Sequence, residues 1–591
     1  MSTPQVAHVG GGGGGGDNNV PLLAENDLDS NDCILRQNGW LCGFRVDNTD
    51  GPQTLTRQVA SYTNGAVPLV EETNNLLTEV ITTHNKRESN YVHHGWSAGA
   101  VATISPWTSS RIDATNRHNL EGAWITRRTL AQRLRVRVFL EDLAPVPEFE
   151  AAIEEALSQP TKFEKFQKVY HTLDRWGDVV PLEIEIGFSL SLTDKEANFS
   201  QLEFPAMTSY NSLNQLSTIK TANIARKGAA SNAGWGNGTW ATIDVSAVEW
   251  RPIRIAAVTP TINLLASNLQ TQLAELYAER LSYVPPLTID PIRVFCKIYD
   301  DTINASKTIW KVVLRSSDYI DSLSITYLDG TTSRGGGNGG DEHTFALTNG
   351  EHIMEILTCS DVEWLRGIQF ITNTGRCSAI YGVFEGIPTI SRSKGGILAG
   401  LSTSTKKSPT GQHWVTGVRG IWRHDLIPKV PKEDDVYSDY FGGQLQHGKG
   451  FNDRGLIGNS SSAYISSVEV RAHGDIHSIE ITYTDTRDSK TRKFKAPRHG
   501  GSHGPHYRFD LERGEHIVSV SGTFNDSFLR QLCFGTNLGR ASEVYGHGGG
   551  QSFSARAPLG ENGKSMRLQY VIGKCNVGLD GLIFVWTSDL S

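Results

Sequence analysis

The sequence lacks several features that would place it in a common class of protein. Basic residues are not in excess, since 56 lysines and arginines stand against 63 aspartates and glutamates and the formal net charge is -7. Nucleic-acid-binding proteins normally carry a basic excess or a basic stripe, so we expect no nucleic-acid partner. No run reaches the roughly 18 consecutive apolar residues that a membrane-spanning helix needs. We therefore expect a chain without a transmembrane helix.

Cysteine is scarce, and the first residues do not resemble a secretion signal. The seven cysteines are an odd number without a CxxC pair, which predicts neither a disulfide framework nor a zinc site. The 18 histidines show no HExxH spacing, so we expect no metal and no other cofactor. The start lacks a basic end followed by an apolar run. We therefore expect synthesis in the cytoplasm, with leaderless secretion and membrane association left open.

Glycine, by contrast, is abundant, and its distribution divides the chain. The tract Gly10–Gly16 lies in residues 1–30, which we expect to form a disordered leader. Further glycine clusters follow residue 330, between short alternating apolar runs. Strand-to-strand turns use glycine because it adopts positive φ at low cost. The second half is therefore predicted to be rich in β-strands.

Residues 31–285 have the pattern of an α+β domain. Apolar residues recur at helical spacing in three stretches and alternate with period two in two others. The predicted helices are Leu69–His84, Glu148–Leu173 and Ile262–Tyr283, and the predicted strands are Leu134–Leu143 and Pro181–Leu192. The proline-rich stretch Pro285–Pro291 predicts a domain boundary.

The remaining chain contains an internal repeat. Several blocks recur in the same order at an offset of about 156 to 164 residues, which predicts two copies of one β module. We place the copies at residues 292–425 and 437–591, joined by a charged linker at residues 426–436. The paired blocks are Ile320–Gly330 with Ile476–Thr486, Asn349–Ile353 with Arg513–Ile517, and Thr372–Arg376 with Thr536–Arg540.

These repeated blocks resemble the jacalin-related lectin family. The resemblance rests on the order I-x-S-x-x-I-x-Y, a glycine-rich turn, GE-x-I, T-N-x-G-R and Y-G. It implies that each copy is an all-β prism of three four-stranded sheets. One sugar is then held between the loop that opens the module and the loop before its last strand. Mannose- or galactose-type glycans are the implied partners.

The second copy keeps most of the implied sugar site. GKGFND begins at Gly448, and NVGLD stands where the family has G-x-x-x-D, with asparagine in place of the glycine. A carboxylate in such a loop can accept hydrogen bonds from neighbouring sugar hydroxyls. The implied carbohydrate-binding residues are Gly448, Asn576, Val577, Gly578 and Asp580.

The first copy departs from this pattern. Its last block reads GVRG where the second copy has GLDG, which places Arg419 at the position of Asp580. An arginine only donates hydrogen bonds, so it cannot replace an accepting carboxylate. We therefore expect the first copy to be a spacer or to bind something else, such as an anionic group. A β scaffold without any sugar site is the alternative for both copies.

The block Phe163–Leu192 resembles divergent members of the membrane attack complex/perforin (MACPF) family. A predicted helix runs into Trp176 and Gly177, and a long strand carrying Gly187 follows. The resemblance implies a bent antiparallel sheet flanked by helical clusters that unfurl into membrane-spanning hairpins as subunits form a ring. The implied partners are a lipid membrane and further copies of the chain, and strands of about 9–11 residues suffice to span. The hairpin regions are expected near Leu69–Pro106 and Asn198–Ala241.

Two motifs of hydrolases occur, but in the wrong context. GWSAG begins at Gly95 and HGGG at His547, in the reverse of the order that hydrolases use and in different modules. We therefore expect no enzymatic activity. The predicted class is a multidomain protein with an α+β MACPF-like domain followed by two jacalin-like β-prisms. We expect a glycan-binding, membrane-targeted protein of the pore-forming type, and the alternative is a soluble lectin whose MACPF-like domain does not insert.

Overall fold

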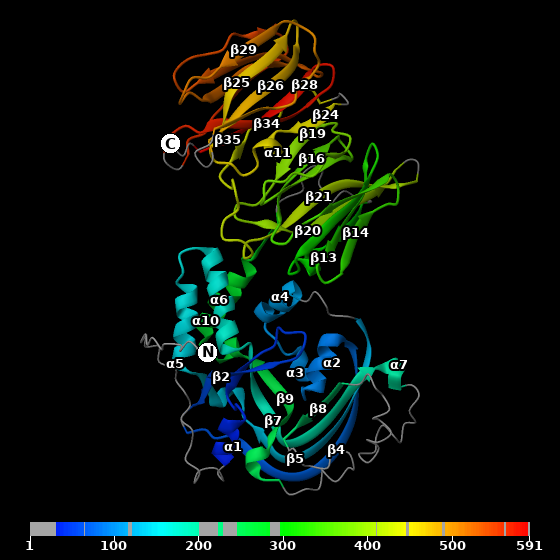
Figure 1. Cartoon of the computed structure of the whole chain (residues 1–591), viewed down its shortest axis with the longest axis vertical. Coiled ribbons are helices and arrows are strands. Elements are labelled where there is room, and N and C mark those ends of the chain that lie inside the picture. Colours follow the sequence, from blue (N-terminus) through cyan, green and yellow to red (C-terminus); the bar gives the residue numbers. More distant parts are fainter. Residues whose placement is uncertain are drawn as a thin grey trace, which may run out of the picture.

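A computed structural model of the chain describes residues 31–63, 65–115, 121–199, 223–228, 245–283, 296–408, 411–444, 448–486, 491–560 and 563–588. The predicted leader, residues 1–30, lies outside the described residues. The chain forms three bodies that follow one another along its longest axis (Figure 1). An N-terminal α+β domain lies at one end, and two β-prisms complete the molecule.

A sheet of long antiparallel strands forms the centre of the N-terminal domain. Its strands run in the order β2-β1-β7-β5-β4, and β8 and β9 also pair with β7. A separate pair joins β3 and β6. The strands are β1 (Cys42–Arg45), β2 (Gln53–Gln58), β3 (Ala60–Tyr62), β4 (Leu69–Asn85), β5 (Glu121–Arg137), β6 (Leu143–Pro145), β7 (Val179–Lys195), β8 (Asn223–Lys227) and β9 (Arg251–Pro260).

Helices cover this sheet and occupy its long connections. Three helices follow β4 before the chain returns as β5, and two more precede β7. The helices are α1 (Asn31–Gln37), α2 (Lys86–His93), α3 (Ala98–Ala102), α4 (Pro106–Thr115), α5 (Pro147–Leu157), α6 (Lys162–Trp176), α7 (Glu196–Phe199) and α10 (Ser267–Ala278). In the described part of the chain, no helix combines the length and the apolar character needed to cross a bilayer.

The stretch Leu69–His84, predicted to be helical, is instead the strand β4. It pairs with β5 along its whole length, from Leu69 opposite Arg137 to Asn85 opposite Glu121. Its second half is rich in β-branched residues, with Val80, Ile81 and three threonines, and these favour a strand. Pairing with a long neighbour overrides the weak helical period. The predicted helix Glu148–Leu173 is confirmed as α5 and α6, separated by a short turn. The predicted strand Pro181–Leu192 is confirmed within β7.

The third predicted helix, Ile262–Tyr283, is shorter than expected. Only α10 is α-helical, and Leu281–Tyr283 form the strand β10. This strand pairs with the last strand of the first prism, so that Leu281 lies opposite Arg423. The first prism therefore begins before residue 285, the predicted end of the N-terminal domain.

Gly187 marks a change of neighbour along β7. Up to Gly187 the strand pairs with β9, and from Ser189 it pairs with β8. On its other side, the register with β5 shifts between Gln132 and Leu134. A Cβ atom at Gly187 would lie 2.1 Å from the carbonyl oxygen of Ala131. Only glycine permits this close approach of backbones at the bend of the sheet.

The first prism consists of three four-stranded sheets. Their orders are β10-β21-β20-β11, β14-β13-β12-β15 and β18-β17-β16-β19. The strands after β10 are β11 (Lys297–Asp300), β12 (Ile309–Ser316), β13 (Ile320–Tyr327), β14 (Thr332–Gly336), β15 (Asp341–Ala346), β16 (Ile353–Ser360), β17 (Leu365–Thr372), β18 (Tyr381–Gly382), β19 (Ile387–Ser391), β20 (Ile397–Lys407) and β21 (His413–Arg423).

The second prism repeats this arrangement. Its sheets are built on β22-β35-β34-β24, β27-β26-β25-β29 and β32-β31-β30-β33, with β23 and β28 as short additions. The elements are β22 (Val436–Tyr437), β23 (Phe441–Gly442), β24 (Lys449–Asn452), α11 (Arg454–Ile457), β25 (Ala463–Ala472), β26 (Ile476–Asp485), β27 (Arg492–Lys495), β28 (His499–Gly500), β29 (His506–Asp510), β30 (Ile517–Phe524), β31 (Leu529–Thr536), β32 (Tyr545–Gly546), β33 (Gln551–Arg556), β34 (Arg567–Cys575) and β35 (Leu579–Thr587).

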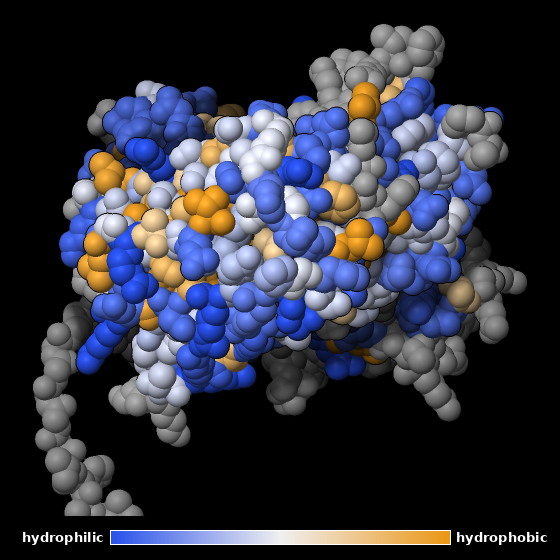
Figure 2. All heavy atoms as spheres, turned by 90° about the horizontal axis from the view of Figure 1, so that it is seen from above, coloured by the Kyte–Doolittle hydropathy of each residue, from blue (hydrophilic) through white to orange (hydrophobic). Residues whose placement is uncertain are grey.

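The two prisms share a buried hydrophobic cluster. Met354, Leu357 and Phe384 of the first prism belong to the same core cluster as the interior of the second. The predicted linker, residues 426–436, packs into this junction, and Val430 is buried. Figure 2 shows the end of the molecule that carries the second prism, where hydrophobic side chains are scattered among hydrophilic ones. Such scattering is normal for a face exposed to water.

Candidate functional site

The structure brings Gly448 and Asp580 together in the second prism. Gly448 directly precedes β24, Asp580 is the second residue of β35, and both strands pair with β34. A Cβ atom at Gly448 would lie only 2.3 Å from the Asp580 Oδ2 atom. Glycine is therefore the residue that leaves room for this carboxylate. The two positions that the sequence pattern predicts form one small site.

The Asp580 carboxylate lies in an unusual environment. The residue is 0% exposed, and neither carboxylate oxygen has a hydrogen-bond partner within the described residues. Burial raises the pKa of Asp580 to about 6, and the charge of Lys574 opposes that rise. Buried carboxylates nearly always find donors, so one without them has open capacity for the hydroxyl groups of a ligand.

The loop Asn576–Gly578 leads into β35 and ends two residues before Asp580. The amide of Asn576 donates to the carbonyl of Gly578 over 2.9 Å, and Val577 is 65% exposed. Asn576 does not adopt a positive φ, so asparagine replaces the glycine of the family pattern without backbone strain. The turn after β28 packs closely on this loop, since a Cβ atom at Gly501 would lie 2.3 Å from the carbonyl oxygen of Val577.

The first prism lies directly against this site. Phe384 forms an antiparallel bridge with Gly448, and the Lys574 ammonium group donates to the carbonyl of Gly386 over 3.0 Å. A Cβ atom at Gly450 would lie 2.5 Å from the Phe384 ring. The turn Val383–Gly386 therefore packs on the opening loop of the second prism. No pattern in the sequence predicts this contact, because it depends on how the two copies pack.

The structure corrects the expected position of Arg419. In the second prism, Lys574 of β34 lies opposite Gly581 of β35. In the first prism, Ser404 of β20 lies opposite Gly417 of β21. The next residue shows the same register shift in both strand pairs, so the two pairs are equivalent. Thr416, the residue before Gly417, therefore occupies the place of Asp580, and its hydroxyl bonds the Ser404 hydroxyl at 2.8 Å. Arg419 lies further along β21. The placement of Arg419 at the sugar-binding position was wrong, and the suggestion of an anionic ligand there loses its basis.

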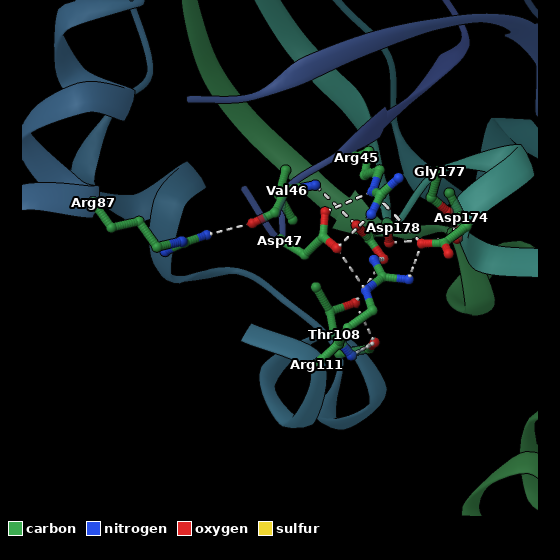
Figure 3. Close-up of polar contacts among 11 residues, drawn as sticks. Arg45, Val46, Asp47, Arg87, Thr108, Arg111, Asp174, Gly177 and Asp178 are labelled. Atoms are coloured by element: carbon green, nitrogen blue, oxygen red, sulfur yellow. Dashed lines mark hydrogen bonds and ion pairs between the residues drawn. The ribbon is translucent and has the colours of Figure 1, made fainter. Parts of the chain in front are cut away.

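A second cluster of polar residues lies beside Gly177 in the N-terminal domain (Figure 3). Trp176 ends α6, and Gly177 has a φ of +101°. A Cβ atom at Gly177 would lie 2.6 Å from the Cα atom of Gly43, so these glycines let the end of α6 pass closely over β1. This crossing places the next residue, Asp178, in the interior.

Asp178 accepts three hydrogen bonds from two segments, one from the residue after β1 and two from α4. The donors are the amide of Val46 at 2.8 Å, the Thr108 hydroxyl at 3.1 Å and the Arg111 guanidinium at 2.5 Å. Arg111 also pairs with Asp174 at 2.7 Å. Burial raises the pKa of Asp178, and the charge of Arg111 opposes the rise. Helix α4, which lies in the connection between β4 and β5, is thereby fastened to the junction of α6 and β7.

Helix α2 of the same connection is also fastened to the sheet. The Arg87 guanidinium donates to the carbonyl of Val46 over 2.8 Å, and the His93 Nδ1 atom lies 2.8 Å from the Thr193 hydroxyl (Figure 3 shows the Arg87 contact). The Lys227 ammonium group on β8 donates to the carbonyl of His94 over 2.8 Å. The first expected hairpin region, Leu69–Pro106, thus consists largely of β4 and the helices that follow it. Most of the second, Asn198–Ala241, lies outside the described residues.

Comparison with known proteins identifies the domains. A family model described as a fungal MACPF-like domain matches residues 40–238, and one described as a jacalin-like lectin domain matches residues 297–407 and 438–580. The chain therefore carries a fungal MACPF-like domain followed by two jacalin-like lectin domains. The expected domain types and their order are confirmed, as is the multidomain fold class.

Solved structures of lectins are similar to part of the chain. A Malaysian banana lectin is 22% identical and covers 26% of this chain and 99% of its own, with a TM-score of 0.21. A mannose-binding jacalin-related lectin from Ananas comosus is 19% identical, with coverages of 26% and 99% and a TM-score of 0.21. Artocarpin in complex with mannopentose is 21% identical, with coverages of 26% and 97% and a TM-score of 0.21. A search of curated proteins finds no match.

Proposed function

We propose that the chain binds glycans through its second jacalin-like domain and thereby directs its MACPF-like domain to a membrane. The observation that carries the proposal is the Asp580 carboxylate, buried beside Gly448 without a donor in the described part of the structure. The Asn576–Gly578 loop supplies the adjoining wall. No catalytic step is part of this function.

Mannose-type sugars are the first ligands to test. The similar lectin from Ananas comosus is described as mannose binding, and the artocarpin structure is a complex with mannopentose. Galactose is the second ligand, since the loop pattern alone does not choose between hexoses. In either case Asp580 would accept hydrogen bonds from neighbouring hydroxyls, and backbone amides of the two loops would donate.

Access to Asp580 involves the first jacalin-like domain. Its turn Val383–Gly386 packs on the loop that opens with Gly448, and Lys574 is held by the Gly386 carbonyl. We propose that glycan binding loosens this contact, so that an occupied site and a closed junction exclude one another. The two jacalin-like copies then have different roles, one binding and one covering.

The insertion step would use the two long connections of the central sheet. Residues 86–120 link β4 to β5, and residues 196–250, which include the short strand β8, link β7 to β9. Each can supply a hairpin whose strands need only about 9–11 residues to cross a bilayer. The bonds of Arg111 to Asp178 and Asp174 hold the first connection on the sheet, so they would have to break before it extends. Several copies would then assemble into a ring.

Release of a dye trapped in liposomes tests both halves of the proposal. The liposomes carry total lipid extracts, and mannose or galactose is added as a competitor. Leakage that the sugar suppresses, and that Asp580→Ala abolishes, is the expected result. Leakage that is unaffected both by the added sugar and by Asp580→Ala would contradict the sugar-directed step. Sugar-inhibitable binding without leakage under every lipid composition would support the alternative, a soluble lectin with a MACPF-like domain that does not insert.

A further inference from the structure

The first jacalin-like domain contains a cavity of about 220 Å³ at the seam between β11 and β14. Its floor is apolar, and its sides carry an aromatic ring and a carboxylate. It is separate from the predicted sugar site, which lies in the other domain. The lining includes Tyr299, Asp301, Ile303, Leu323, Gly335 and Leu401.

The register of the strands shows what occupies this space in the second domain. Gly335 lies opposite Leu323, and His499 lies opposite Ile479. Leu323 and Ile479 are equivalent residues of the repeated block, as IDSLSITY and IHSIEITY show. His499 therefore stands in the second domain where the first has Gly335. The first copy lacks a whole imidazole ring at this position.

The surroundings of His499 reveal how the ring is held. It stacks on Phe451 with ring centroids 3.6 Å apart and planes inclined by 5°. Its Nε2 atom lies 2.9 Å from the Asp453 Oδ1 atom. The site thus consists of an aromatic face and a carboxylate that binds the ring nitrogen.

Both of these partners are present in the first domain. Lys297 lies opposite Thr405, and Lys449 lies opposite Cys575, at the same point of the two equivalent strand pairs. Counting along from there, Tyr299 stands in the place of Phe451 and Asp301 in the place of Asp453. The first copy thus has an aromatic residue and a carboxylate at these two positions, but no ring at the position of His499. The Lys297 ammonium group lies over the Tyr299 ring, 4.6 Å from its centroid, which leaves the other face of the ring for a ligand.

Other side chains fill the space only in part. Thr403 stands where the second domain has Gly573, and a Cβ atom at Gly335 would lie 3.1 Å from the Thr403 Cβ atom. Asp301 accepts from Asn304 at 2.6 Å, from Ser333 at 2.8 Å and from the Tyr327 hydroxyl. A carboxylate has about four acceptor positions, so it can take a further donor. The cavity stays open beside Tyr299 and Asp301.

We propose that this cavity is a binding site for a planar nitrogen heterocycle of the imidazole type, which stacks on Tyr299 and donates an N–H group to Asp301. The ligand takes the position that the His499 ring has in the second domain. The apolar floor of Leu323 and Leu401 covers the edge of the ring. The proposal does not depend on glycan binding or on membrane insertion.

Saturation-transfer NMR on the full chain tests this proposal, with imidazole as the probe and furan as the control. Furan has the same ring size but no N–H group, so stacking alone would let both bind. A five-atom ligand in a fitting site reaches a Kd of about 1 mM. We expect transfer to imidazole and at least a tenfold weaker affinity for furan. Equal binding of the two, or no transfer to imidazole, would overturn the proposal.

A variant that copies the second domain gives the matched control. Gly335→His combined with Thr403→Gly rebuilds the pair His499 and Gly573, and Gly335 has no positive φ that would strain a side chain. We expect this variant to lose imidazole binding at least tenfold. Unchanged binding would place imidazole elsewhere and refute the assignment.

The reverse variant opens the second domain. His499→Gly removes the ring that stacks on Phe451, and we expect it to lower the thermal stability of the chain. Added imidazole should restore part of the loss, whereas furan should restore less. If neither imidazole nor furan restores thermal stability, the aromatic face and the carboxylate do not hold a ring in this position. That result would also count against the proposal for the first domain.

Discussion

Replacing Asp580 with asparagine should stabilise the second jacalin-like domain while it removes the carboxylate proposed to bind sugar. Burial raises the pKa of Asp580 from 3.8 to about 6. An acid whose pKa is higher in the folded state destabilises that state once it ionises. The penalty is therefore complete above about pH 6 and disappears below about pH 4. Asparagine has nearly the same shape and carries no charge at any of these pH values.

The size of the effect follows from the shift in pKa. A shift of one unit corresponds to about 1.4 kcal/mol, so the ionised carboxylate costs the folded state about 3 kcal/mol. The attraction of Lys574 is already contained in this figure, because its charge opposes the rise in the pKa. We therefore expect a net gain of about 3 kcal/mol in the free energy of unfolding at pH 7.5. For a domain of this size, that gain raises Tm by about 6–12 °C.

Thermal unfolding at pH 7.5 and pH 4 measures this effect. Hydrogen exchange on β34 and β35 assigns the transition to the second domain. Asp526→Asn, a change at an exposed aspartate of the same domain, is the matched control and should leave Tm unchanged. A loss of stability at pH 7.5, or a gain that persists at pH 4, would refute the reasoning. Sugar binding by Asp580→Asn should fall in the same preparation.

Three further predictions concern the N-terminal domain and the junction. Arg111→Ala should destabilise the MACPF-like domain by about 3 kcal/mol, because it leaves Asp178 buried without its counter-charge, and hydrogen exchange should rise first in α4. The double variant with Asp178→Asn should recover part of the loss, and no recovery would contradict the pairing. Gly177→Ala should lower the free energy of unfolding, measured with urea, by more than about 2 kcal/mol, since φ at this position is positive and the added Cβ atom would meet Gly43. An unchanged free energy would contradict the close crossing of α6 over β1. Phe384→Ala should strengthen mannose binding several-fold in calorimetry, because it loosens the junction that covers Gly448. Phe345→Ala, a core change away from the junction, should leave the affinity unchanged. Equal affinities in the two variants would count against the covering role.

The sequence predicts the domain order because its signals are local or repeated. The blocks that recur between the two copies occupy equivalent strands and turns of the two prisms. The Phe163–Leu192 block forms a helix and a long strand as expected. The register between β20 and β21 could not be read in the same way. GVRG and GLDG look alike, but the matching residues are Thr416 and Asp580, and only strand pairing identifies them.

Contacts between distant segments account for the other differences. The spacing of apolar residues in β4 predicts a helix. The segment is a strand because it pairs with β5, and that pairing depends on the whole sheet and not on the local sequence. Asp178 directly follows the aromatic-glycine pair, yet its role was not predicted, because its donors come from segments far apart in the chain. A polar residue directly after such a pair was the available signal. No feature of the sequence predicts that Phe384 of the first copy packs against Gly448 of the second.

The shared core of the two jacalin-like domains has a consequence for the recognition of branched or clustered ligands. A flexible tether lets two modules search for epitopes over a range of separations. Here Val430 and the junction around Phe384 are buried, so the two domains keep one spacing and orientation while the junction is closed. In that state only a ligand whose groups match this spacing can contact both domains. Glycan binding that opens the junction, as proposed, would release the domains from this spacing and let them reach groups at other separations.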